Sequence, residues 1–246
     1  MSERRIRAAS KTDVGLKRSR NEDSVLMRPE AGLWAVADGM GGHGGGDVAS
    51  RMAVEALQSI PFGPTAAARL AAVETAVLAA NGEMRAYAQS IGRPIMGTTL
   101  VALLVFGEHF ACLWCGDSRA YLLRGGLLRQ LTRDHSETQD LVDRGVLDPD
   151  EAKTWPRRSV LTRALGATDA PLLDLVSDRL EPGDAFLLCS DGLTNHCEDS
   201  DIAAALVGDD PQAICDELIA LTLQRGASDN VSAVVLRCEA PELPAS

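Results

Sequence analysis

A series of short apolar runs joined by very short connections restricts the possible folds of this chain more than any other feature. In the middle of the sequence LVALLVF, HFACLWC and AYLLR follow one another, and GEH, GDSR and GG mark the breaks. Runs of this length bounded by Gly and Asp are typical of β-strands. Connections this short join antiparallel neighbours, because a parallel crossover needs about a dozen residues or more. The pattern predicts antiparallel hairpins at all three breaks.

Helical periodicity lies on both sides of these strands. Residues 46–60 and 64–91 carry apolar side chains at three- and four-residue intervals, and Thr65 is suited to cap the second helix. A later pair covers residues 199–208 and 210–226 and ends at a glycine. Central strands with helical pairs between them predict an α+β fold of packed antiparallel sheets covered by helices.

The charge balance excludes some classes of partner. The chain has 24 Lys and Arg against 35 Asp and Glu, a net charge of −11. This balance disfavours nucleic acids and anionic membranes as partners. The N-terminal MSERRIR does not resemble a secretory signal, and no apolar run approaches the roughly 20 residues of a membrane span. We expect a cytoplasmic monomer.

Two of the six cysteines form a CxxC pair, Cys112 and Cys115, which can indicate zinc or redox chemistry. The pair lies in a strand-like run, where an odd offset sends the two side chains to opposite faces. No second CxxC accompanies it. We expect all six cysteines to be buried, reduced thiols.

A glycine-rich stretch, VADGMGGHGGG, follows the apolar run LWAVA and precedes a helix. Gly39, Gly41 and Gly44 match the GxGxxG pattern of dinucleotide-binding enzymes, so an oxidoreductase is the first alternative. That fold needs a second strand after the helix, whereas here another helix is expected. A Walker A loop is also excluded, because no Lys-Ser/Thr pair follows the glycines.

Acidic residues recur where apolar runs begin or end. Each alone is an ordinary turn former. The members of this set are Asp38, Asp117, Asp191 and Asp229, with Glu22 and Asp23 just before another run. If these ends converge, the carboxylates repel and need a divalent cation pair. Oxygen ligands favour Mg²⁺ or Mn²⁺ over zinc, and glycine allows a backbone carbonyl to approach as an additional ligand.

Eight motifs in order make the chain resemble the PPM family, the metal-dependent type 2C protein serine/threonine phosphatases, in its compact bacterial form. They are RSRNEDS, VADGMGGHGGG, MGTTLVALL, CGDSRAYLL, LTRDHS, SVLTRALG, LLCSDGLTN and SDNVSAVVL. The resemblance covers about residues 13–236. It implies a β-sandwich of two antiparallel sheets flanked by antiparallel helical pairs, in one domain over residues 1–239 with a short tail at 240–246.

The resemblance also implies roles for individual residues. Asp38 resembles the aspartate that bridges two Mn²⁺ or Mg²⁺ ions, with the Gly39 carbonyl on one of them. Asp191 and Asp229 resemble ligands of the other ion, and Glu22 and Asp23 the acids that hold metal-bound water. Asp117, together with Asp191, matches the site of a third, weaker ion. Arg18 matches the arginine that binds the substrate phosphate.

The implied reaction is direct hydrolysis of phosphoserine and phosphothreonine in proteins by an activated water. Two close cations lower the pKa of a shared water, and phosphoryl transfer needs charge neutralisation more than covalent help. A cysteine-based mechanism is excluded, because no cysteine has an arginine at the C-x5-R offset. Met40 replaces the histidine that follows Asp-Gly in many eukaryotic members, so His43 and a metal-bound water remain alternative proton donors. His135 in LTRDHS is expected to be structural.

The charged segment 136–160 separates two motif-bearing regions and, by resemblance, is a flap beside the active site that helps to choose phosphoprotein substrates. The family also implies signalling partners, a bacterial serine/threonine kinase and its substrates. A pseudophosphatase that binds phosphoproteins without turnover is the alternative function. It predicts loss of a ligand among Asp38, Asp191 and Asp229, and all three are present.

Overall fold

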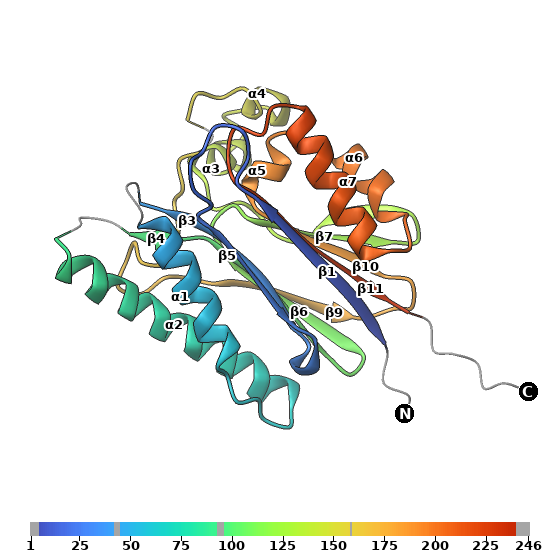
Figure 1. Ribbon diagram of the computed structural model, residues 1–246, viewed down its shortest axis with the longest axis horizontal. Helices are drawn as coiled ribbons and strands as arrows, with labels where there is room; N and C mark the ends of the chain where they lie inside the picture. The colour runs from blue at the N-terminus through green and yellow to red at the C-terminus, as the bar shows by residue number, and fades with distance from the viewer. Residues whose placement is uncertain (1–4, 42–44, 93–95, 158, 240–246) are drawn as a thin grey trace, which may run out of the picture.

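Two antiparallel β-sheets lie face to face in the computed structural model, which describes residues 5–41, 45–92, 96–157 and 159–239 (Figure 1). The first sheet consists, in spatial order, of β1 (Ile6–Asp13), β11 (Val231–Cys238), β10 (Ala185–Cys189), β7 (Arg119–Arg124) and β8 (Leu127–Gln130). The second consists of β2 (Asp23–Arg28), β3 (Leu33–Met40), β5 (Leu100–Phe106), β6 (His109–Cys115) and β9 (Asp174–Arg179), and β4 (Gly97–Thr98) pairs with β3. Every strand pair is antiparallel, as the short connections predict.

Helices cover the outer face of each sheet (Figure 1). The second sheet is covered by α1 (Gly46–Gln58) and α2 (Ala66–Ser90), and the first by α5 (Asp191–Thr194), α6 (Asp199–Leu206) and α7 (Pro211–Gln224). Two further helices, α3 (Glu137–Asp143) and α4 (Pro149–Ala152), belong to segment 136–160, for which the family resemblance predicts a flap and which is called the flap segment below. The 3₁₀ turn η1 (Pro29–Ala31) joins β2 to β3. This α-β-β-α layering confirms the predicted fold class.

The alternation of side chains along β3 shows how the layers form. Trp34 and Val36 pack between the two sheets, whereas Leu33, Ala35 and Ala37 pack under α1 and α2. Because successive strand residues face opposite sides, one strand contributes to two cores. A third core lies between the first sheet and α5–α7. The central strands of each sheet are therefore apolar on both faces, which explains why their sequences show apolar runs instead of alternation.

Helix boundaries follow the local signals. The side chain of Thr65 accepts a hydrogen bond from Ala68 N at 3.1 Å, which confirms it as the cap of α2. Before α7, Asp210 Oδ1 accepts from Gln212 N at 3.1 Å, and Gly226 follows the helix with φ +106°. Helix α1 leads into α2 and not into a strand, so the Rossmann alternative is excluded. Among the described residues, no helix combines the length and apolarity that crossing a membrane requires.

One of the three predicted hairpins is wrong. The GEH and GG connections join paired strands, β5 with β6 and β7 with β8. The GDSR connection instead carries the chain from β6 in the second sheet to β7 in the first. Gly116 makes this redirection possible, because its φ of +112° is a conformation that other residues rarely adopt. Connection length alone does not distinguish a hairpin from such a crossing.

The cysteines match the expectation. Cys112 packs between the two sheets, whereas Cys115 packs under the helices, so the CxxC side chains do point to opposite faces. All six cysteines are free and buried, and burial raises the pKa of Cys112 and of Cys115 to about 12. A thiol with so high a pKa is a poor nucleophile and a poor metal ligand at neutral pH.

Candidate active site

Asp23 and Asp38 are neighbours because β2 and β3 pair in register at these residues. Asp23 Oδ2 accepts hydrogen bonds from Ser190 Oγ at 2.8 Å and from Ser232 Oγ at 2.7 Å. Its other carboxylate oxygen, Oδ1, is buried and has no hydrogen-bond partner among the described residues. Ser190 follows β10 and Ser232 lies in β11, so Asp23 links the ends of the two sheets.

Backbone contacts hold Glu22 and Gly39 at the same place. Gly39 N donates to Glu22 O at 3.1 Å, and Glu22 N donates to Asn230 Oδ1 at 2.8 Å. A Cβ on Gly39 would lie 2.1 Å from Gly46 O, and a Cβ on Gly46 would lie 2.9 Å from Glu22 Cδ. The glycines therefore allow the first turn of α1 to pack against the end of β3, with the Glu22 side chain beside it.

Asp191 and Asp229 reach the same region from the first sheet. Asp191 begins α5 directly after β10, and Asp229 lies just before β11. A Cβ on Gly192 would lie 1.9 Å from Asn230 O, so the start of α5 is in direct contact with the loop that carries Asp229. Arg18 Nη2 donates to Asp229 Oδ2 at 2.7 Å, and the Arg18 side chain is 53% exposed. Arg18 thus lies at the solvent edge of the site, beside Asp229, whose side chain is 33% exposed.

Asp117 is held by the crossing between β6 and β7. A Cβ on Gly116 would lie 2.6 Å from the Thr99 side chain. Gly116 N donates to His135 Nδ1 at 3.0 Å, and Gly116 O accepts from His135 N at 2.9 Å. The His135 ring is buried, and its Nε2 lies 3.2 Å from Asp174 Oδ2. His135 therefore supports the turn that carries Asp117, in agreement with its expected structural role.

The acids influence one another electrostatically. Burial raises the pKa of Asp38 well above its ordinary value, and the charges of Asp23, Asp191, Asp117 and Asp229 raise it further. Burial also raises the pKa of Asp23 to about 6, although its two serine hydrogen bonds oppose the shift. The pKa values of Asp117 and Asp191 rise for the same reasons, burial first and neighbouring carboxylates second. Such a group of carboxyls favours binding protons or a cation over remaining fully charged.

The chemistry of these groups suits a hard cation. Carboxylate and backbone oxygens are the donors that Mg²⁺ and Mn²⁺ prefer, and Asp23 Oδ1 is a buried acceptor without a partner. Within the described parts of the chain, however, no three His, Cys, Asp or Glu side chains are arranged so that they could hold a metal ion as they stand. Asp229 pairs with Arg18 instead. In donor type and charge the residues fit Mg²⁺ or Mn²⁺, although they do not form a closed set of ligands.

Sequence patterns indicated the acids but missed the polar groups that hold them. Thr99 Oγ1 accepts from Asp38 N at 3.0 Å, and Thr99 N donates to Asp38 O at 2.8 Å. Asn230 Nδ2 donates to the carbonyls of Val14 and Arg20, both at 2.8 Å. The missed residues are Thr99, Ser118, Ser190, Asn230 and Ser232. Their only signal in the sequence is that most of them lie within three residues of a candidate acid.

His43, the candidate proton donor, lies outside the described residues, as does the tail 240–246. Every other candidate belongs to a described part of the chain. Asp38 is paired in register with Asp23, and the charges of Asp23, Asp191, Asp117 and Asp229 all contribute to raising the pKa of Asp38.

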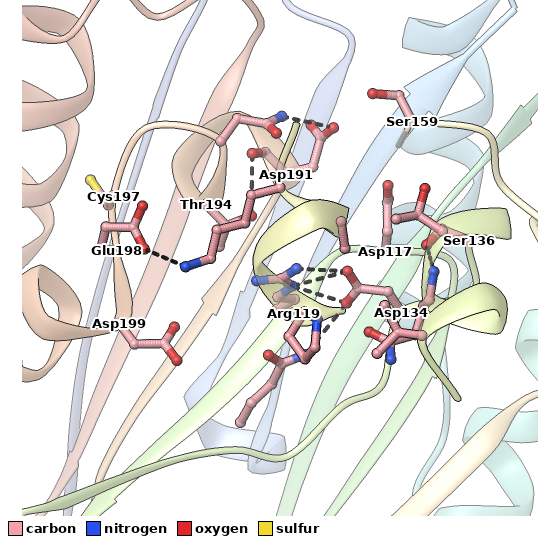
Figure 2. Close-up of a pocket in the computed structure, with 18 of the residues that line it drawn as sticks. Asp117, Arg119, Asp134, Ser136, Ser159, Asp191, Thr194, Cys197, Glu198 and Asp199 are labelled. Carbon is pink, nitrogen blue, oxygen red and sulfur yellow. Dashed lines mark hydrogen bonds and ion pairs between the residues drawn. The ribbon is translucent and has the colours of Figure 1, made fainter. Parts of the chain in front are cut away.

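The flap segment borders a cavity of about 690 Å³ (Figure 2). The base of the segment is closed where Ser136 pairs with Leu161 and Glu137 N donates to Val160 O at 2.9 Å. Asp117 and Asp191 line the cavity together with residues of α3, α4 and the start of α6. The cavity is therefore continuous with the acidic site.

The family model described as "Protein phosphatase 2C" matches residues 17–214. Among curated relatives, the serine/threonine protein phosphatase PstP of Mycobacterium tuberculosis is 41% identical over 232 residues. The match covers 94% of this chain but only 44% of the length of that protein.

Solved structures agree. A structure described as "PppA, a key regulatory component of T6SS in Pseudomonas aeruginosa" has a TM-score of 0.88 and 43% identity, and the match covers 95% of this chain and 97% of that one. The catalytic domain of PstP, solved in complex with two manganese ions, has a TM-score of 0.86 and 38% identity, with 96% and 99% covered. Since the family model matches well over half of the sequence, this chain belongs to the protein phosphatase 2C family.

Proposed function

We propose that this chain is a metal-dependent phosphatase that hydrolyses phosphoserine and phosphothreonine in proteins. The family match, the names of the relatives and the manganese-bound structure of a homologous catalytic domain support the proposal. The catalytic unit is a domain of residues 1–239 in which segment 136–160 is a flap.

Two Mn²⁺ or Mg²⁺ ions are the proposed cofactors. Their proposed ligands are carboxylates at the ends of strands, together with one backbone carbonyl: Glu22, Asp23, Asp38, Gly39, Asp191 and Asp229. Asp117, with Asp191, is the proposed site of a third and weaker ion. When bound, such ions neutralise phosphate charge and lower the pKa of water, so that hydroxide becomes available near neutral pH.

The chain itself supplies binding, orientation and support. Arg18 is the proposed phosphate ligand, because a planar guanidinium at the solvent edge of the site can hold two phosphate oxygens at once. Thr99 fixes the backbone of Asp38, and Asn230 joins the loop of Arg20 to that of Asp229. His43 remains a proposed proton donor to the leaving alkoxide.

The observation that carries the proposal is the geometry around Asp23. It is paired in register with Asp38, and its Oδ2 accepts hydrogen bonds from Ser190, next to Asp191, and from Ser232, three residues after Asp229. A binding-only pseudophosphatase is not favoured, since Asp38, Asp191 and Asp229 are all present. The test is hydrolysis of p-nitrophenyl phosphate with Mn²⁺ and with excess EDTA. We expect turnover that requires the metal, and equal turnover in EDTA would contradict the mechanism.

The proposed substrates are phosphorylated proteins, and a serine/threonine kinase acting on the same substrates is the proposed signalling partner. The monomeric state, the cytoplasmic location and the lack of nucleic-acid and membrane partners stay predictions of the sequence. Phosphoproteomics of cells with and without the gene would identify the substrates directly.

A further inference from the structure

The cavity beside the flap has the size and position of a recognition site. Its volume of about 690 Å³ lies within the roughly 300–1,000 Å³ of typical ligand pockets. Figure 2 shows Ser136 on one side of the cavity and Glu198 and Asp199, at the start of α6, on the opposite side. Thr138 of α3 also lines the cavity. Asp117 and Asp191 are among the lining residues, so a polypeptide with its phosphate at the acidic site could continue into the cavity.

Most of the positive charge in the cavity wall is already neutralised. Arg119 Nε and Nη2 donate to the two oxygens of Asp134 at 2.9 and 2.7 Å, and Nη1 donates to Tyr121 Oη at 3.1 Å. Both nitrogens that face the carboxylate are engaged, as Figure 2 shows. This pair therefore adds little net charge for a ligand to recognise.

The opposite wall carries surplus negative charge. Glu198 and Asp199 are both exposed. Among the described residues that line the cavity, Lys153 is a cation close to this wall, and its Nζ lies 3.0 Å from Asp150 and 3.9 Å from Glu198. Because Lys153 is shared between two acids, its charge does not balance Glu198 and Asp199.

An unsatisfied hydroxyl lies on the flap side. Thr138 is 6% exposed and lines the cavity, and its Oγ1 has no hydrogen-bond partner among the described residues. Buried hydroxyls are nearly always paired in folded proteins. An incoming polypeptide with its own donors and acceptors would supply a partner after a small shift of the flap.

We propose that this cavity receives the segment of the phosphoprotein next to the phosphorylated residue, and that Glu198 and Asp199 select a Lys or Arg side chain in that segment. The inference rests on the proposed phosphatase function and adds the sequence preference of the substrate. Because Asp191 lines the cavity, we infer that the ligand is the polypeptide whose phosphate lies at the acidic site. Because Glu198 and Asp199 also line it, we infer that this polypeptide carries a positive charge there.

The expected preference is modest. Partly exposed ion pairs are worth about 0.2–1 kcal/mol, so one basic residue should raise kcat/KM about 1.4- to fivefold. The preference should decline with added salt, because exposed charges are screened. Lys153 competes for the same acid, so Lys153→Gln should increase the preference.

The test uses phosphothreonine peptides with alanine at all flanking positions except one, at which lysine is placed in turn on either side of the phosphate. The quantity measured is the ratio of kcat/KM for each lysine peptide to that for the all-alanine peptide. We expect a ratio of about 1.4 to 5 at one or two neighbouring positions in the unmodified protein, and a ratio near one in Glu198→Gln/Asp199→Asn. Because the two kcat/KM values in each ratio are measured with the same variant, a general loss of activity in that variant does not change the ratio.

Asp209→Asn is the matched control, since it removes an equal charge from an exposed residue beyond the other end of α6 and outside the cavity. This variant should keep the ratio of the unmodified protein. Thr138→Val should lower kcat/KM for all the peptides equally.

If the protein hydrolyses p-nitrophenyl phosphate but the ratio of kcat/KM is near one at every lysine position, this inference is overturned and the proposed function stays intact. A preference that survives Glu198→Gln/Asp199→Asn would also overturn it. If p-nitrophenyl phosphate is not hydrolysed, the proposed function fails. Fluorescence anisotropy of the same labelled peptides then decides the inference, because preferential binding of the lysine peptides needs no turnover.

Discussion

The hydrogen bonds that fix Asp38 are made by its main chain. Its N–H donates to Thr99 Oγ1, and its carbonyl accepts from Thr99 N and Thr98 Oγ1. The carboxylate itself lies among other acids, which raise its pKa. The backbone thus holds a charged group in a place that is unfavourable for that group alone, as is common where a site is organised for binding rather than for stability.

Replacing Asp38 by asparagine should reduce metal-dependent turnover strongly. Removing a group that only supports a metal ligand costs about 10- to 100-fold, so removing a proposed ligand should cost at least about 100-fold. The measurement is kcat for p-nitrophenyl phosphate across a Mn²⁺ titration. Asp209→Asn is the control, and a rate for Asp38→Asn within a few-fold of the unmodified protein would remove Asp38 from the site.

His135 gives a prediction about pH. Burial is the main reason that its pKa lies below the ordinary value of 6.5. The unfolded chain therefore takes up a proton on this ring more readily than the folded chain does. Its contribution to the free energy of unfolding is complete above pH 6.5 and declines as the pH falls through 6.5 toward the folded-state value.

His135→Asn should remove this dependence while keeping an acceptor for Gly116 N. We expect the unfolding free energy of the unmodified protein to fall more than that of the variant between about pH 7 and about pH 5.5, the range in which histidine titrates. Urea denaturation in EDTA at several pH values measures the difference. The contribution of the carboxylates to the pH dependence cancels in this comparison, because both proteins contain the same carboxylates. Parallel curves would show that the ring does not titrate differently on folding.

At the level of elements, the strands that the sequence patterns did not predict are β1 and β9, and both lie at the edge of a sheet. β1 reads IRAASKTD and β9 reads DLVSDR, and neither contains a continuous apolar run. An edge strand is paired on one side only and can remain polar. Its position is therefore fixed by pairing with a neighbour, which sequence periodicity does not show.

Two glycines in helices should respond in opposite ways to alanine. A Cβ at Gly82 in α2 would meet no atom within 4 Å, so Gly82→Ala should stabilise the protein by about 0.5–1 kcal/mol through lower backbone entropy in the unfolded chain. A Cβ at Gly192 would lie 1.9 Å from Asn230 O, so Gly192→Ala should cost about 1–3 kcal/mol or more.

Guanidinium denaturation midpoints measure both changes. Gly192→Ala should also reduce phosphatase activity, because the start of α5 carries Asp191, whereas Gly82→Ala should not. Equal stability of the two variants would mean that α5 does not press against the loop before β11 as described.

For the whole molecule, the sequence predicted the layers and the acids, but not how the layers bring the acids together. The order of apolar runs and helical pairs is local information, and it was sufficient to predict packed antiparallel sheets covered by helices. The sandwich of two sheets flanked by helical pairs was implied by the family resemblance. The meeting of Asp23 with Ser190 and Ser232 depends on the stacking of one sheet on the other, and their separation in the chain gives no sign of it. The crossing at Gly116 was missed for the same reason, because a short connection can change sheets.

The crowding of acids between the two sheets predicts that metal stabilises the whole fold. A ligand at about 100 times its Kd adds about 2.7 kcal/mol to the free energy of unfolding, and about 1 kcal/mol corresponds to roughly 2–4 °C in a chain of this size. Mn²⁺ should therefore raise Tm by about 5–10 °C for each ion bound, and added NaCl at equal ionic strength is the control for screening.

Asp38→Asn should raise the melting temperature of the metal-free protein and lower it relative to the unmodified protein when Mn²⁺ is bound. It removes a carboxylate whose pKa is raised by burial and by four like charges, so in EDTA the variant should melt at a higher temperature than the unmodified protein. In Mn²⁺ the order should invert, because the variant lacks the proposed bridging ligand and gains less from the ion. Differential scanning calorimetry of both proteins with and without Mn²⁺ measures the four temperatures. If the variant melts lower than the unmodified protein in EDTA, Asp38 stabilises the metal-free fold, and mutual repulsion is not what makes this group of acids favour a cation.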